Sequence, residues 1–178
     1  MARKALFICF IITLAAWTAA SAATVDISRW IEKREAIKIY ISGVTNESGQ
    51  SQINADNFKK VLESSIRNRR SVKFEVVTDP LISNFQISAV IKKYSYSKTD
   101  PINSFTGVPA LALDALTTEN YAEMSADFTI TSTKTGNIVW KDNVFDFVEH
   151  MMTPEESTSM VYDKTARKFL WKAFGKGK

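Results

Sequence analysis

The sequence predicts a small α+β domain, in which one sheet of four or five mostly antiparallel strands carries two helices on one face. Three observations support this. Segments with alternating apolar and polar residues recur along the chain, as in half-buried strands. Two segments have apolar residues at helical spacing, one after the first strand and one near the end. Several strands are joined by short links, which favour antiparallel pairing. The expected order is β-α-β-β-β-β-α.

Five strands are expected from alternation. In the first, Ile37, Ile39 and Ile41 alternate with polar residues, and Gly43 with the polar stretch 45–49 ends it. In the fourth, Phe128 is expected to face the helices. A turn at 134–137, with a glycine where a positive φ is needed, joins the last two strands. The five predicted strands are residues 37–42, 72–76, 85–91 with a continuation towards Tyr96, 124–131, and 138–148.

Both helices carry start signals. Asn54 is placed to cap the first helix, and this helix is expected to end at residues 68–70. Arg69 and Arg70 at its end read either as a phosphate clamp or as a solvated last turn. The final helix begins with Thr153 as cap, Pro154 in the first position and Glu156 completing a capping box. Gly175 is expected to end it.

The first 22 residues have the pattern of a secretory signal peptide. Arg3 and Lys4 precede a mostly apolar run, and small residues around Ala22 fit a cleavage site. The run is shorter than the roughly 20 residues that a spanning helix needs. We therefore expect an exported protein, in the periplasm, with residues 23–178 forming one domain. Association with the outer membrane stays open. Within the domain, 101–120 is an irregular insertion.

The single cysteine lies inside that apolar run. Cys9 would leave with the signal, so the mature chain would hold no thiol for a disulfide, a metal or catalysis. It also stands too early to be the lipidated cysteine of a lipoprotein. We expect no lipid anchor.

Charge argues against nucleic acid as a partner. Removing Arg3 and Lys4 from 23 lysines and arginines leaves 21, against 19 acidic residues, so the mature chain is nearly neutral. Basic residues gather instead in the last helix. Its cations are a candidate site for an anionic ligand, with ordinary solvated side chains as the alternative. These candidates are Lys164, Arg167, Lys168 and Lys172.

No catalytic or metal-binding constellation is visible in the sequence. His150 is the only histidine, and no G-x-S-x-G elbow accompanies it. Asp142 and Asp146 share one strand face and read as solvated. Glu155 and Glu156 are explained by capping. We expect no enzyme activity, no cofactor and no metal.

Aromatic residues gather around the irregular insertion. Tyrosine and phenylalanine are favoured at protein interfaces, and loops on a rigid sheet often carry binding function. The alternative is that these rings pack over the end of the sheet. The candidate partner-binding residues are Tyr94, Tyr96, Phe105, Leu111, Leu113 and Tyr121.

Several short stretches, taken together over 37–174, resemble envelope lipoproteins of Gram-negative bacteria. They are the strand and loop 39–47, the amphipathic helix before 72–77, the strand 84–94 ending in K-K-Y, and 131–140, which is similar to a D-x-K-T-G-x-x-x-W hairpin. The closing helix completes the order. One family with this layout is LptE-like lipopolysaccharide-assembly proteins, which plug an outer-membrane barrel. Another comprises penicillin-binding-protein activators and curli-secretion lipoproteins.

The resemblance implies a protein that works by binding. The first family implies an accessory in outer-membrane and lipopolysaccharide assembly, with a barrel protein or lipopolysaccharide as partner. The second implies an activator or scaffold of a peptidoglycan-synthesis or secretion complex. A periplasmic hydrolase is a third reading, and the missing catalytic constellation argues against it.

Overall fold

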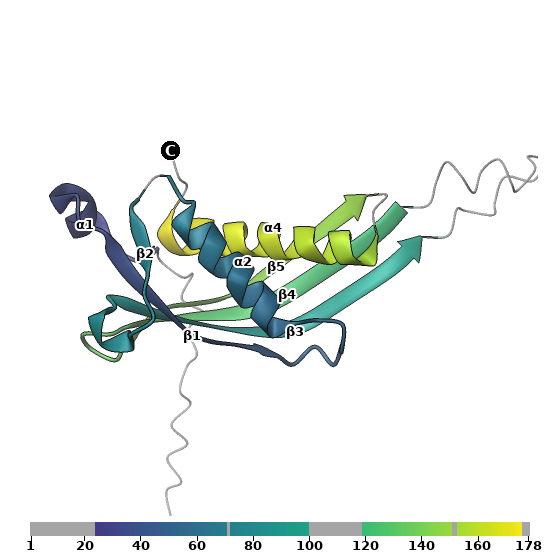
Figure 1. The fold of residues 1–178 in the computed structure, drawn as a ribbon, viewed down its shortest axis with the longest axis horizontal. Helices are drawn as coiled ribbons and strands as arrows, with labels where there is room; N and C mark the ends of the chain where they lie inside the picture. The colour runs from purple at the N-terminus through teal and green to yellow at the C-terminus, as the bar shows by residue number, and fades with distance from the viewer. Residues whose placement is uncertain (1–23, 71, 100–118, 151–152, 176–178) are drawn as a thin grey trace, which may run out of the picture.

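The computed structural model describes residues 24–70, 72–99, 119–150 and 153–175. They form one five-stranded sheet with the strand order β2-β1-β3-β4-β5. Helices α2 and α4 lie together on one face of this sheet (Figure 1). The α+β class, the strand number and the two packed helices are confirmed. The predicted signal peptide and most of the insertion 101–120 lie outside the described residues.

The elements follow the predicted order, with two short additions. A six-residue helix, α1, precedes the first strand, in a segment to which the sequence patterns assign no element, and a 3-10 turn, η1, precedes β3. The bounds are α1 Ser28–Lys33, β1 Ile37–Asn46, α2 Ala55–Arg67, β2 Phe74–Val76, η1 Pro80–Ile82, β3 Phe85–Thr99, β4 Glu119–Ser132, β5 Ile138–His150 and α4 Pro154–Phe174.

The sheet mixes two kinds of pairing. Strand β1 runs parallel to both of its neighbours, β2 and β3. Strands β3, β4 and β5 pair antiparallel along nearly their whole lengths. Helix α2 makes the crossover between β1 and β2, which is why that pair can be parallel. The long antiparallel part therefore dominates the sheet, as predicted.

Strand β1 is longer than alternation predicted. Its register against β3 shifts between Ile41 and Gly43, and pairing then resumes as far as Asn46. The expected end at Gly43 is therefore wrong. A β-bulge of this kind interrupts the two-residue period without ending the strand, so a polar stretch could be mistaken for a loop.

The core lies between the sheet and the two helices. Phe128 of β4 is fully buried, which confirms its predicted orientation. Its ring stacks on Phe169 of α4, with centroids 4.1 Å apart and planes 9° apart. The ring of Phe58 on α2 packs edge-on against the ring of Phe128, with centroids 6.1 Å apart. One β4 side chain thus contacts both helices.

The predicted caps form. The Asn54 side chain accepts a hydrogen bond from the backbone N–H of Asn57 at 3.0 Å. Thr153 accepts from the N–H of Glu156, whose carboxylate accepts from the N–H of Thr153 in return. Gly175 ends α4 at a φ of 80°. These signals are local, so sequence was sufficient to find them.

Candidate functional site

Tyr94 and Tyr96 lie on the helix-facing side of β3. The register of β3 against β4 shifts between Ile91 and Lys93. Without that shift, side chains at even positions would face away from the helices, as Gln86 does. The bulge moves both tyrosines to the covered face.

Packing is the role that the structure gives Tyr94. Its side chain is 3% exposed, and its hydroxyl lies 2.6 Å from the hydroxyl of Thr158 on α4. Burial raises the pKa of Tyr94. The prediction that Tyr94 offers a surface to a protein partner is therefore corrected, because its ring is covered by α4. Tyr96 is half-buried and packs against the same core.

Tyr121 lies on the opposite, uncovered face of the sheet. Its ring stacks on Phe147 of β5, with centroids 5.7 Å apart, and Phe145 lies next to Phe147 at 6.4 Å. Phe145 and Phe147 are 40% and 42% exposed. We call Tyr121, Phe145 and Phe147 the open-face aromatic patch. The sequence pointed to Tyr121 but missed both phenylalanines, which alternation alone placed in a strand without assigning a face to them.

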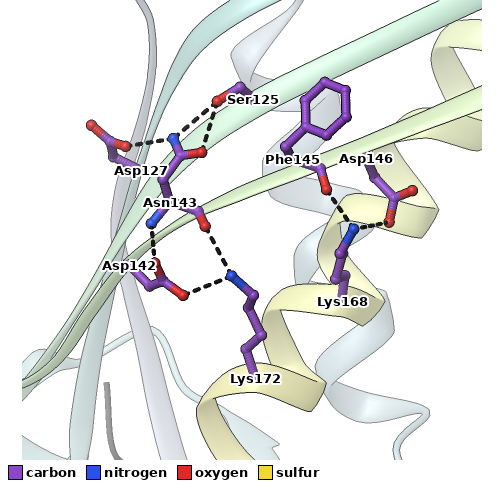
Figure 2. A network of polar contacts seen from close by, with 8 residues as sticks. All are labelled: Ser125, Asp127, Asp142, Asn143, Phe145, Asp146, Lys168 and Lys172. Carbon is purple, nitrogen blue, oxygen red and sulfur yellow. Dashed lines mark hydrogen bonds and ion pairs between the residues drawn. The ribbon is translucent and has the colours of Figure 1, made fainter. Parts of the chain in front are cut away.

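A polar network borders this patch. Asn143 of β5 exchanges hydrogen bonds with Ser125 of β4 and donates one to Asp127 at 2.7 Å (Figure 2). These contacts fix side chains across the two strands. The aromatic rings therefore stand on a stiff sheet with ordered polar neighbours.

The structure does not describe three of the predicted partner-binding residues. Phe105, Leu111 and Leu113 lie outside the described residues. Their part in binding stays a prediction.

The predicted anionic-ligand site on α4 is engaged with the edge strand β5. Three of its lysines recur every fourth residue and so lie along one side of the helix. Four helical residues rise about 6 Å and two strand residues about 6.8 Å, so successive lysines can reach alternate β5 carbonyls. The pairs are Lys164 with the carbonyl of Phe147 at 3.2 Å, Lys168 with Phe145 at 2.7 Å, and Lys172 with Asn143 at 3.2 Å.

Asp142 and Asp146 belong to the same arrangement. Lys172 contacts the carboxylate of Asp142 at 2.7 Å, and Lys168 that of Asp146 at 3.5 Å (Figure 2). The interpretation of both aspartates as solvated is therefore wrong, since they face α4. Lysine side chains at a sheet edge discourage pairing with another chain, and these lysines of α4 occupy three backbone carbonyls of the edge strand β5.

The fourth predicted cation is paired within its own helix. Arg167 contacts Asp163, one turn earlier, at 2.9 Å. All four candidate residues thus have partners in the protein. Binding of an anionic ligand by Lys164, Arg167, Lys168 and Lys172 stays a prediction, and the internal contacts compete with it.

Arg69 has a structural task that neither sequence reading foresaw. Its half-buried guanidinium donates to the carbonyls of Leu170, Phe174 and Gly175 at the end of α4. Carbonyls at a helix end lack partners within the helix, and a cation there is also favoured by the helix dipole. Arg69 therefore joins the two helices instead of forming a phosphate clamp.

A groove opens where the starts of α2 and α4 meet β3. Its volume is about 520 Å³, and Tyr94, Tyr96 and Tyr162 line it. The hydroxyl of Tyr162 donates to the backbone carbonyl of Asn54 at 3.4 Å, and burial raises the pKa of Tyr162 to about 12. We call this the tyrosine groove. The sequence pointed to two of its three tyrosines but assigned Tyr162 to the apolar face of the last helix.

Within residues 24–70, 72–99, 119–150 and 153–175, no group of three or more histidine, cysteine, aspartate or glutamate side chains is placed to hold a metal ion. No helix in the described ranges is long and apolar enough to cross a membrane. The side chain of His150, at the end of β5, is not among those described. The expectation of no enzyme activity remains a prediction.

Comparison with known proteins bears on the fold. No family model matches the chain, and no curated protein matches it. Among solved structures, the PelC dodecamer from Paraburkholderia phytofirmans aligns with a TM-score of 0.53 and 10% identity, covering 78% of this chain and 89% of the PelC chain. A substituted form of that dodecamer gives 0.52 and 11%, covering 77% and 88%. A lipoprotein from Neisseria meningitidis aligns with a TM-score of 0.42 and 10% identity over 75% of this chain and 97% of its own.

The chain therefore shares the α+β fold of PelC. At sequence identities near 10%, the structural alignment supports a shared fold but transfers no function from individual PelC residues to this chain. The α+β fold that the sequence resemblance implies is therefore supported, and the role of LptE-like proteins stays a proposal.

Proposed function

We propose that this protein is an exported, non-catalytic accessory of the cell envelope that works by binding a protein partner. One observation carries the proposal, the open-face aromatic patch. Large aromatic side chains supply much of the energy of protein interfaces when they fill a partner's pockets. Here three of them adjoin one another on a face that neither helix covers.

The surroundings of the patch suit a protein partner. Ordered polar side chains lie next to the rings, with Asn143 bonded to Asp127 at 2.7 Å, and interfaces commonly place a polar rim around an apolar centre. The rings project from paired strands, so little backbone entropy would be lost on binding. Lys93 pairs with Glu123 on the same face and holds the pKa of Glu123 below its usual range.

The partner has two candidate identities. An LptE-like role in outer-membrane and lipopolysaccharide assembly makes the partner an outer-membrane barrel, and the sequence resemblance favours it. The second candidate partner is further copies of this chain, which differs from the activator or scaffold role in a peptidoglycan-synthesis or secretion complex that the second resembled family implies. The second candidate is favoured by the shared fold with PelC, which is described as a dodecamer.

Affinity capture from envelope extracts tests the proposal. Phe145 and Phe147 are changed together to serine, and Leu81→Ser is the matched control because Leu81 is 87% exposed in the η1 turn, outside the patch. We expect the double variant to lose its partner while the control keeps it. Intact-mass identification of the captured protein then separates a barrel from a second copy. Unchanged capture by a folded double variant contradicts the proposal.

A further inference from the structure

The tyrosine groove has the form of a ligand site separate from the aromatic patch. It is concave, and at about 520 Å³ it falls within the size range of small-molecule sites. Three elements distant in sequence build it, namely β3, the start of α2 and the start of α4. Its floor is rigid, because Tyr94 and Tyr162 are each 3% exposed and both hydroxyls are held.

The polar groups around the groove are mostly uncharged. Side-chain amides come from Gln52, Asn54 and Asn57, and a hydroxyl comes from Ser159. The Thr158 hydroxyl is already bonded to the Tyr94 hydroxyl and to the Pro154 carbonyl. An amide offers two donors and an acceptor with two lone pairs, and a hydroxyl both donates and accepts. Such a lining can match a ligand that carries many hydroxyl groups.

The charges of the residues that line the groove cancel. Lys60 and Glu155 are its only charged lining residues in the part of the chain described, one of each sign, and both are exposed. Asp56 and Glu156, in the first turns of the two helices, each follow or precede a lining residue in the chain and add negative charge near the groove.

The two helix starts do not offer a ready anion site either. Asn54 already accepts from the N–H of Asn57, and Thr153 from the N–H of Glu156. Each cap occupies one of the backbone donors at its helix start, which leaves fewer of them to face an anion.

A purely apolar ligand fits no better. It would cover amides and hydroxyls without bonding them, and leaving buried polar groups unpaired costs about 1–3 kcal/mol each. A ligand with apolar faces and hydroxyl edges avoids that cost. Tyrosine rings can pack against such faces while keeping a polar tip.

We propose that the tyrosine groove binds a short, uncharged oligosaccharide. Sugar rings present C–H faces to Tyr96, above the floor that Tyr94 and Tyr162 form, and their hydroxyls bond the polar side chains at the rim. This site goes beyond the proposed function and lies on the other face of the sheet, so either can fail alone.

Isothermal titration with defined sugars tests the site. The protein is purified after export of the full chain, and the probes are trimers of N-acetylglucosamine and glucose, which are neutral. The trimer of glucosamine, which is cationic, and that of galacturonate, which is acidic, are the charged probes. We expect at least one neutral trimer to bind, with affinity little changed by salt, and both charged trimers to bind more weakly.

Variants locate the binding. Tyr96→Ala should weaken the affinity about 2- to 10-fold, as expected for loss of one aromatic contact. Tyr96→Phe, which keeps the ring, should restore most of it, and Asn57→Ala should weaken it. Tyr121→Ala, on the opposite face, should leave it unchanged.

Three results overturn the inference. One is that no neutral trimer binds at millimolar concentration. Another is that an ionic trimer binds more tightly and in a salt-dependent way. The last is that Tyr96→Ala and Asn57→Ala, both folded, bind the neutral trimer as the wild type does.

Discussion

Replacing Phe128 by alanine tests the packing that positions both candidate sites. The ring is fully buried, stacks on Phe169 at 4.1 Å and meets Phe58 at 6.1 Å. Loss of a buried phenylalanine side chain costs about 3–5 kcal/mol, and the near-parallel stack places this site towards the upper end. For a domain of this size, a loss of about 3–5 kcal/mol lowers Tm by roughly 6–20 °C.

Urea unfolding followed by fluorescence measures the effect. Phe145→Ala is the matched control, because Phe145 is an aromatic residue of the adjacent strand that is 40% exposed on the other face. We expect the control to change the free energy of unfolding by about 1 kcal/mol or less. The reasoning is refuted if the Phe128 variant is no less stable than the Phe145 variant with the same urea slope.

Three further predictions use simple measurements. The folded-state pKa of Tyr162 is about 12 against roughly 10 when unfolded, so wild-type stability should fall relative to Tyr162→Phe as pH rises from about 10 to about 12, and parallel pH profiles would contradict this. His150→Ala should leave function in cells intact, whereas a null phenotype with abundant, folded protein would bring an enzyme back into consideration. Intact mass of the exported protein should give a chain beginning near Ala23, and recovery of the full chain or of lipidated Cys9 would show the signal assignment wrong.

Local patterns in the sequence were enough to predict the architecture. Alternation placed Phe128 in a strand facing the helices, and the Thr153 capping box placed the start of α4. Each of these signals lies within a few residues, so it can be read without knowing the fold.

Features that depend on distant pairing could not be predicted. The bulge after Ile91 reverses the faces of β3 and buries Tyr94, and nothing nearby in the sequence marks it. Asp146 appeared solvated because its partner, Lys168, comes from another element. Arg69 caps a helix about 100 residues away. Such contacts exist only once the chain has folded.

The salt dependence of partner capture tests the central claim most directly. Envelope extracts are probed at low and high salt with the wild type and three variants, all checked for folding and abundance. The first changes the open-face aromatic patch at Phe145 and Phe147 to serine. The second changes Phe105 and Leu111 to serine, and the third changes Lys168 and Lys172 to glutamine.

We predict that wild-type capture survives high salt and that the aromatic-patch variant loses the partner at both salt concentrations. Contacts between apolar surfaces resist screening, whereas exposed charge pairs weaken as ionic strength rises. The account is contradicted if the aromatic-patch variant keeps the partner while salt, or the lysine variant, abolishes capture.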